Sequence, residues 1–241
     1  MIQNINTLSI TGITFERLLK FFPYSLQQKP YQLKFAKRGT RIYEPFQQTD
    51  SVYLVKKGRI KIGVEQSTKL EKDNTVLSTK TYIHHIAWEG ELFGEIALMG
   101  TPSMPTFAET MEDMEYYEIS ASAMQSLMQQ NWMVQMQVLQ LVGKRFREAQ
   151  KRLEGYSHQD TRTRIITFLL DLAMEKGEKV GKYGFWVRSF FQQADIAALL
   201  GCSLPAVGLV LRELKQKKLI SYGRKRLQIY NRHELKFAIR E

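Results

Sequence analysis

The sequence predicts an α+β fold in which a strand-rich N-terminal region, one long helix and a mainly helical C-terminal region follow one another. Three observations support this prediction. Residues 31–119 alternate short strand-like runs with turn residues, residues 121–154 show a helical apolar period without proline, and residues 161–241 combine short helical patterns with a terminal pair of strand-like runs. Strands and helices that segregate along the chain in this way are typical of α+β proteins.

The N-terminal strands favour a barrel or a roll. The runs 51–55 and 59–63 are strand-like and are joined across residues 56–58, which end in glycine. The run 75–83 shows partial period-two alternation and follows a polar loop, residues 68–74. Many short strands separated by frequent turns indicate a closed or rolled all-β architecture.

Residues 121–154 predict one long helix that Ser120 can cap. Its seam residues recur at alternating steps of four and three, as in a heptad repeat: Trp132, Met136, Leu139, Gly143, Phe146, Gln150 and Leu153, widened by Val138, Val142 and Ala149. At about 1.5 Å per residue the helix would be about 50 Å long, more than a small β-domain covers. We therefore expect Trp132, Met136, Leu139, Gly143, Phe146 and Leu153 to form a dimer interface. The alternative is a helix packed on its own domain.

Composition and motifs limit the functional classes. A hydrophobic fraction of 44% fits a globular protein, and no apolar run approaches the length of a membrane span. Residues 1–22 lack the pattern of a signal peptide, so we expect a cytoplasmic location.

The one cysteine, Cys202, excludes a disulfide framework, and adjacent His84 and His85 point to opposite faces of a strand. We expect no metal and no cofactor, and the lack of a catalytic motif argues against an enzyme.

The net charge of +11 is unevenly distributed. Residues 1–80 carry +8, residues 81–143 carry −8 and contain no Lys or Arg, and residues 144–241 carry +11. Because Lys and Arg release counterions from nucleic-acid phosphates, the basic C-terminal third is consistent with a polyanionic partner. A solvated basic surface is the alternative.

Residues 193–214 predict two short helices separated by a sharp turn at Gly201, where a positive φ is expected. Ser203 can cap the second helix, and Pro205 is tolerated in its first turn. Inward-facing residues define both helices: Ile196, Leu199 and Leu200 in the first, and Val207, Val210, Leu211 and Leu214 in the second. This is the pattern of a helix-turn-helix, whose second helix enters the major groove of DNA. The alternative is two packed helices of no particular function.

The strand-like runs 219–222 and 227–230 predict a hairpin across residues 223–226. Beside a helix-turn-helix, such a basic hairpin would be a wing that contacts phosphates. The residues expected to bind DNA are Gln193, Ser203, Leu204, Ala206, Leu209, Arg212, Arg224, Lys225 and Arg226.

Together these motifs resemble the Crp/Fnr family of bacterial transcription regulators. The segment 195–203 with Val207-Gly208 and Leu219-Ile220 looks like the DNA-binding module of the family, 53–62 like its strand–glycine–strand signature, and 90–98 like the start of its phosphate-binding cassette. The resemblance implies a cyclic-nucleotide-binding-like β-roll sensor domain with double-stranded β-helix (jelly-roll-like) topology. It also implies a homodimer on a roughly two-fold-symmetric operator. We assign the domains as residues 1–120 for the roll, 121–154 for the dimerisation helix and 155–241 for the winged helix-turn-helix.

The roll departs from the family pattern. In its cyclic-nucleotide binders an arginine holds the cyclic phosphate, and that position falls here on Met104 or Pro105. The resemblance suggests that Glu95 accepts a ribose hydroxyl, but a buried phosphate facing Glu95 without a basic partner would be costly. We therefore expect no cAMP binding in the usual way and leave the effector open. The candidate effector-binding residues are Gly94, Glu95, Ile96, Ala97, Pro105 and Thr106.

The second helix of the helix-turn-helix also departs. Family members place Arg and Glu where this chain has Leu204 and Pro205, and another Arg where it has Leu209. The corresponding contacts to guanine and cytosine are lost, whereas apolar side chains contact thymine methyl groups, so we expect an A·T-rich site. The alternative is that exposed leucines bind a protein partner. RNA polymerase is a candidate partner for the acidic middle region.

Overall fold

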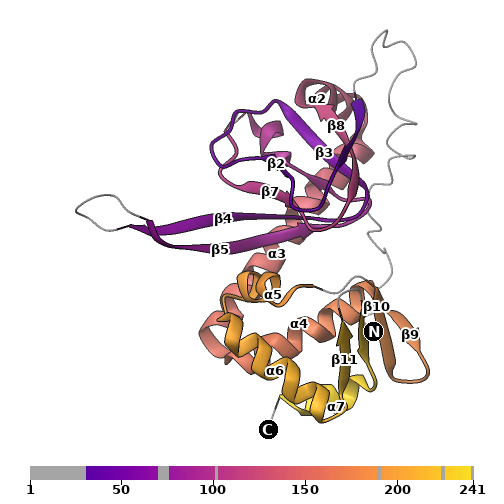
Figure 1. Cartoon of the computed structure of the whole chain (residues 1–241). Helices are drawn as coiled ribbons and strands as arrows, with labels where there is room; N and C mark the ends of the chain where they lie inside the picture. The colour runs from indigo at the N-terminus through magenta and orange to yellow at the C-terminus, as the bar shows by residue number, and fades with distance from the viewer. Residues whose placement is uncertain (1–30, 70–75, 101–102, 189–190, 224–225, 240–241) are drawn as a thin grey trace. The chain divides into compact units, whose positions relative to one another are not determined.

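The structure is a computed structural model, shown in Figure 1. The residues that it describes are 31–69, 76–100, 103–188, 191–223 and 226–239. Contacts divide the chain into two compact units. The first comprises residues 1–66 and 83–146, and the second comprises residues 67–82 and 147–241.

In the part of the chain that the structure describes, the strands before residue 121 form a roll of two four-stranded sheets, with the orders β1-β8-β3-β6 and β2-β7-β4-β5. The strands are β1 (Tyr31–Ala36), β2 (Arg41–Tyr43), β3 (Ser51–Lys57), β4 (Ile60–Lys69), β5 (Val76–Ala87), β6 (Leu92–Phe93), β7 (Phe107–Thr110) and β8 (Met114–Ser120). The first strand pairs antiparallel with the last, and β2 pairs with β7. This interleaved order confirms the predicted jelly-roll-like roll. The inner strand β3 is buried from Ser51 to Val55 without alternation, because Tyr53 and Val55 pack into one hydrophobic cluster and Val52 and Leu54 into another.

Charges that are far apart in the sequence meet on the surface of the roll. Basic side chains from residues 34–61 pair with carboxylates from residues 109–118: Lys34 with Glu118, Lys37 with Asp113, Arg41 and Lys61 with Glu109, Lys56 with Glu115, and Arg59 with Glu112. The positive and negative segments predicted from the sequence therefore largely compensate each other in this unit.

The predicted single helix over residues 121–154 is wrong, because two helices occupy this region. α2 spans Ala121–Gln130 and α3 spans Trp132–His158, and Asn131 between them has extended φ and ψ angles of −138° and 101°. The Asn131 side chain accepts a hydrogen bond from the backbone N–H of Met133 at 3.0 Å, so it acts as a cap that starts a new helix. Ser120 caps α2 as predicted, through the N–H of Ala123. With 27 residues, α3 is about 40 Å long.

The second unit contains the C-terminal helices and a third sheet, with the order β11-β12-β10-β9. Its C-terminal elements are α4 (Thr161–Lys176), β9 (Glu178–Val180), β10 (Gly184–Arg188), α5 (Gln193–Leu200), α6 (Leu204–Gln216), β11 (Ile220–Gly223), β12 (Arg226–Ile229) and α7 (Arg232–Phe237). The predicted hairpin is confirmed by the antiparallel pairing of β11 with β12. A helix pair followed by this hairpin is a winged helix-turn-helix.

Among the described residues, no single helix has both the length and the apolar character that crossing a membrane requires. Only the bent pair formed by α5 and α6 reaches those values, with both helices counted together. The bend between them is 114°.

Candidate functional site

The turn between α5 and α6 has the geometry that its residues predict. Gly201 has a φ of 61° and ends α5, and Ser203 accepts a hydrogen bond from the N–H of Ala206 at 3.3 Å and starts α6. The bend of 114° between the helices falls in the range of helix-turn-helix motifs. All predicted inward-facing residues are buried: Ile196, Leu199, Leu200, Val207, Val210, Leu211 and Leu214.

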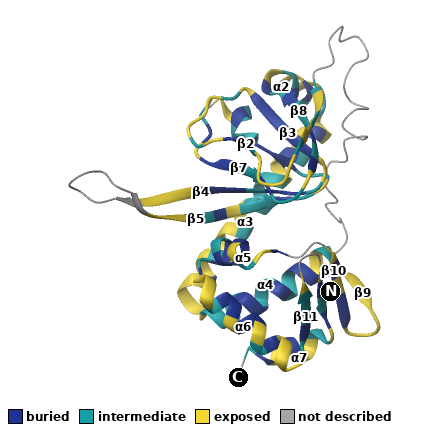
Figure 2. Cartoon of the chain, viewed as in Figure 1, coloured by how far each residue is buried: buried dark blue, intermediate teal, exposed yellow. Residues whose placement is uncertain are grey.

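The side chains predicted to contact DNA gather on the opposite face of α6. Figure 2 shows this helix with a buried and an exposed side. Leu204 is 50% exposed and Leu209 is 62% exposed, and Arg212 lies on the same side. Ser203 is exposed and Ala206 is half-buried at the edge of this face. The outer face of α6 is therefore apolar over its first two turns.

Gln193 joins this face from the neighbouring helix. It is the first residue of α5, and a β-carbon on Gly208 of α6 would lie 3.0 Å from its amide oxygen. The same β-carbon position lies 3.9 Å from a terminal nitrogen of Arg212. The structure thus brings Gln193 and Arg212, which are 19 positions apart in the sequence, to one place on α6.

Three basic residues of the wing are predicted to contact DNA, and the structure describes one of them. Arg226 is exposed on β12, whereas Arg224 and Lys225 lie outside the described residues. On the adjacent strand, Arg188 stands opposite Arg226 and pairs with Glu178 at 3.2 Å. Arg188 is not among the residues predicted from the sequence to bind DNA, although its position directly after a strand-like run was a usable signal.

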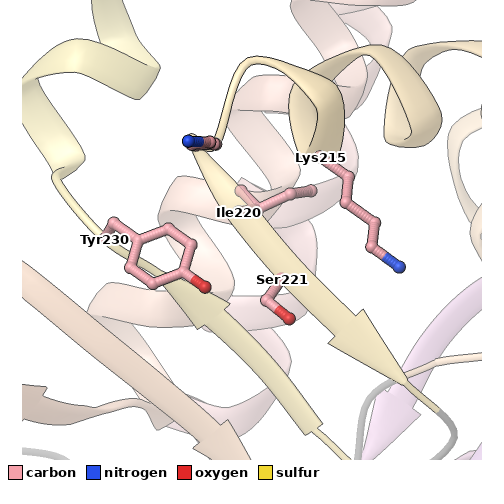
Figure 3. A pocket seen from close by; sticks show the side chains of 5 residues that line it. Lys215, Ile220, Ser221 and Tyr230 are labelled. Carbon is pink, nitrogen blue, oxygen red and sulfur yellow. The ribbon is translucent and has the colours of Figure 1, made fainter.

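A pocket at the base of the wing was also not predicted. It has a volume of about 460 Å³ and is lined by Lys215, Lys218, Ile220, Ser221 and Tyr230. Figure 3 shows Lys215 near the end of α6, Ser221 on β11 and Tyr230 directly after β12. The run of lysines from 215 to 218 was the signal in the sequence. The pocket adds two ammonium groups to the basic surface of the second unit.

Two arginines of α4 hold the helix-turn-helix in place. Arg162 forms an ion pair with Glu213 of α6, and Arg164 donates to the carbonyl oxygen of Leu200 at 3.2 Å. The Arg164 guanidinium also lies over the ring of Tyr156, 5.1 Å from its centroid. That ring lies against Gly201, where a β-carbon would come within 3.2 Å of it. The turn of the motif is therefore packed against the end of α3.

In the roll, Gly94, Glu95, Ile96 and Ala97 lie together at the start of a short 3-10 helix, η1 (Glu95–Met99). Gly94 has a φ of 73°, and a β-carbon there would lie 3.0 Å from the ring of Tyr53, so the position requires glycine. Of the other candidate effector residues, Pro105 is exposed, and Thr106 is buried and hydrogen-bonds with Tyr43.

The space beside η1 is filled by the side chains of the roll itself. The rings of Tyr53 and Phe93 stack with their centroids 4.9 Å apart, and the Tyr43 ring lies 5.9 Å from that of Tyr53. Burial raises the pKa of the Tyr43 hydroxyl. Met104 is fully buried in the same cluster. A fully buried thioether thus occupies one of the two positions where the family pattern has a phosphate-binding arginine.

Glu95 has a basic partner, contrary to the expectation from the sequence. Arg145 of α3 forms an ion pair with it, and both side chains are only 13% exposed. Arg145 also donates to the backbone carbonyl oxygen of Leu92. The preceding residue, Lys144, pairs with Glu91 at 3.4 Å. The prediction considered residues 81–143, and the partner is two positions beyond that segment.

α3 has two different faces in the first unit. Val134 and Val138 are buried in the core of the roll, so the prediction that Val138 widens the outer seam is wrong. The spacing of four residues directs both valines to the roll. The predicted interface residues of α3 lie elsewhere on the helix, and all but the half-buried Gly143 are exposed: Trp132 (72%), Met136, Leu139, Phe146 and Leu153.

Cysteine, histidine and carboxylate side chains are the potential metal ligands of this chain. Cys202 is buried in the turn of the helix-turn-helix. Within the described ranges, no group of three or more His, Cys, Asp or Glu side chains is arranged to hold a metal ion.

Comparisons with known proteins agree with this architecture. A model of the cyclic nucleotide-binding domain matches residues 33–131, and a model of the Crp-like helix-turn-helix domain matches residues 163–237. The chain belongs to the Crp/Fnr family. As a member of this family it is a DNA-binding transcription regulator and not an enzyme.

The similar Crp/Fnr proteins cover most of the chain at low identity. The global nitrogen regulator of Synechococcus elongatus is 23% identical over 84% of this chain and 87% of its own length. The cAMP-activated global transcriptional regulator CRP of Pasteurella multocida is 23% identical over 82% of this chain and 88% of its own. Among solved structures, FixK2 from Bradyrhizobium japonicum has a TM-score of 0.69 at 18% identity, covering 86% of this chain and 96% of FixK2.

Proposed function

We propose that this Crp/Fnr protein acts as a homodimer in the cytoplasm and binds an A·T-rich, roughly two-fold-symmetric DNA site. In this proposal residues 1–120 are the sensor domain, 121–154 the dimerisation segment and 155–241 the DNA-binding domain. The observation that carries it is the outer face of α6, whose exposed Leu204 and Leu209 lie in the winged helix-turn-helix that also exposes Arg226. Apolar side chains suit thymine methyl groups, and basic side chains suit phosphates.

The exposed seam of α3 supports the homodimer. Trp132, Leu139, Phe146 and Leu153 are each more than 60% exposed and follow a heptad spacing. Large apolar side chains in such a row mark an interface, because leaving them in water sacrifices the free energy of their burial. Two chains joined along α3 would present two winged domains to successive grooves of one duplex.

The roll supports a regulator that does not use cAMP in the usual way. Although one relative is named as cAMP-activated, Glu95 is already neutralised here by Arg145, and Met104 fills the core beside η1. Gly94, Glu95, Ile96, Ala97, Pro105 and Thr106 stay candidates for another effector. In a thermal-shift titration we expect millimolar cAMP to leave the melting temperature unchanged, and a saturable increase would contradict this part of the proposal.

The contact with RNA polymerase also stays a proposal. The acidic residues of β7 and β8 are engaged in ion pairs, for example Glu109 with Lys61 and Glu115 with Lys56. A polymerase surface would therefore meet a mixed rather than an acidic face of the roll.

Sedimentation velocity and fluorescence anisotropy test the proposed function together. We expect the wild-type protein to sediment as a dimer and to bind a duplex selected from a random pool. The variant Leu139→Glu introduces a charge into the seam and should sediment as a monomer with weaker DNA binding. Phe35→Glu is the matched control, because Phe35 is 71% exposed on β1 of the roll. A wild-type monomer that does not change on adding DNA would contradict the proposal.

A second candidate function is the binding of a protein partner by the outer face of α6, and the exposure of Leu204 and Leu209 favours it. Complexes held by apolar contacts persist in high salt, whereas DNA complexes weaken. Co-purified partners that remain bound at 0.5 M salt (roughly the level at which phosphate contacts fail) and dissociate on Leu209→Glu would support this function. The loss of partners at the same salt that releases DNA would exclude it.

A further inference from the structure

The outer face of α6 has an unusual distribution of polar groups for a DNA-binding helix. From Ser203 to Leu211 the helix carries no charged side chain, and Arg212 is its first. Leu204 and Arg212 are eight residues apart, so they lie on one stripe of the helix with Gly208 between them. The centre of the stripe thus has no side chain of its own.

Gln193 occupies that centre. A β-carbon on Gly208 would lie 3.0 Å from its amide oxygen, which is closer than a β-carbon normally approaches another atom. An alanine at this position would require the Gln193 amide to shift by a few tenths of an ångström, and a larger side chain would compete with the amide for its place beside α6. Position 208 has no side chain, and the amide of Gln193 lies beside it. The polar group at this place on α6 therefore comes from α5, the first helix of the motif.

The Gln193 amide and the two leucines of this surface match the groups that an A·T pair presents. A glutamine amide donates to N7 and accepts from the N6 amino group of adenine, and leucine methyl groups contact the C5 methyl of thymine. A cytosine amino group needs a carboxylate acceptor, but Glu213 is engaged by Arg162 on the side of α4. Arg212 is the one charged donor on the outer face of α6 among the residues from 203 to 212.

We propose that Gln193 makes the principal polar base contact of this regulator, to adenine, while Leu204 and Leu209 contact thymine methyl groups on either side of it. This assignment rests on the proposed DNA-binding function and specifies which groups on the DNA are recognised. It makes Gly208 a positioning residue, because a side chain at position 208 would press on the amide of Gln193.

Base analogues test the proposal on the duplex that the wild-type protein selects from a random pool. Replacing one recognised thymine by deoxyuridine removes only the methyl group and should weaken binding about threefold to fourfold. Replacing the recognised adenine by 7-deazaadenine removes the N7 acceptor and should weaken binding about fivefold or more. In Leu204→Ala and Leu209→Ala, the deoxyuridine effect should disappear at the thymine that each leucine contacts.

Variants at positions 193 and 208 test the polar contact. Gln193→Ala should lose about tenfold in affinity for the selected duplex and become insensitive to 7-deazaadenine, because the variant and the analogue remove the same interaction. Gly208→Ala should weaken binding in the same direction but by a smaller factor, because its β-carbon shifts the amide by only a few tenths of an ångström, while the fold, measured by circular dichroism, is retained. Gln192→Ala is the matched control, because Gln192 is the exposed neighbour that precedes α5 and makes no side-chain cap.

The outcomes separate this proposal from the function on which it rests. If the wild-type protein prefers its selected duplex but tolerates both analogues, or if Gln193→Ala behaves like Gln192→Ala, the assignment of the base contacts is overturned and DNA binding stands. A selected duplex without A·T pairs in its half-sites overturns it equally. If the protein prefers no duplex over bulk DNA, sequence-specific binding itself is lost.

Discussion

Arg145 of α3 forms an ion pair with Glu95 of η1, in a place where both side chains are almost shielded from solvent. The two residues are 50 positions apart, and Arg145 also donates to the carbonyl oxygen of Leu92. One guanidinium therefore links the helix to the segment that begins with Gly94. In the first unit this link accompanies the burial of Val134 and Val138 in the core of the roll.

The first prediction concerns this ion pair. Arg145→Met leaves the Glu95 carboxylate buried without a cationic partner, which should lower the free energy of unfolding of the roll by about 3 kcal/mol. Urea denaturation followed by circular dichroism measures the change. The double variant Glu95→Gln, Arg145→Met should regain most of the loss, because it removes the buried charge. Equal stability of Arg145→Met and the wild type would show that the pair does not stabilise the roll.

The second prediction concerns the turn of the helix-turn-helix. Gly201→Ala places a β-carbon in a left-handed conformation and 3.2 Å from the Tyr156 ring, so we expect a loss of about 2 kcal/mol in unfolding free energy. Gly181→Ala is the matched control, since Gly181 has a φ of 65° with no atom within 4 Å of the β-carbon position. The control should cost about 1 kcal/mol from backbone strain alone. Thermal denaturation compares both variants, and equal losses would mean that the Tyr156 contact contributes nothing.

The third prediction concerns the wing. Arg226 is exposed and lies opposite Arg188, an arrangement of like charges that a phosphate would relieve. Arg226→Ala should weaken binding to all duplexes by a similar factor and reduce the slope of log K against log salt by about 0.9. Anisotropy titrations at several salt concentrations provide the slope. Lys37→Ala, which removes an exposed cation paired with Asp113 in the roll, should leave the slope unchanged.

The fourth prediction concerns the cap of α4. Asp160 accepts a hydrogen bond from the N–H of Thr163 at 2.7 Å, and this bond holds the pKa of its carboxyl below the usual value. A lowered pKa in the folded state stabilises the protein above the unfolded pKa of about 3.9, and the contribution is lost as the pH falls through the folded value. Asp160→Asn keeps the cap without the charge, so the wild type should be more stable by about 0.5 kcal/mol at pH 7.

The same comparison at low pH completes this test. Once the pH lies below the lowered pKa of the folded state, the stability difference between wild type and Asp160→Asn should vanish, since the carboxyl is then protonated in both folded and unfolded states. Urea midpoints at pH 7 and at a series of pH values below about 3.9 provide the comparison. A constant difference across this range would contradict the role of the charge.

Local features of the helix-turn-helix could be predicted from the sequence because neighbouring residues determine them. Gly201 with its positive φ, the Ser203 cap and the spacing of the buried leucines all depend on contacts within a few residues. The hairpin of β11 and β12 belongs to the same class. The outward-facing leucines Leu204 and Leu209 were also predictable, because the inward-facing residues of α6 determine which face remains outside.

Features that depend on distant residues could not be predicted. Asn131 is tolerated inside a helix at a small cost, so its propensity alone did not reveal the break between α2 and α3. The partner of Glu95 required the path of α3 past η1, and the place of Gln193 required the packing of α5 on α6. The ion pairs between residues 34–61 and 109–118 likewise depend on the pairing of β1 and β3 with β8 and of β2 and β4 with β7.

The central claim is that two copies of the chain present α6 to neighbouring grooves of one duplex, and selection of bound sequences from random duplex DNA tests it most directly. The account predicts two inverted A·T-rich half-sites whose centres are about one helical turn apart. Recovery of an unenriched pool, or of a single half-site with no inverted repeat, would contradict it.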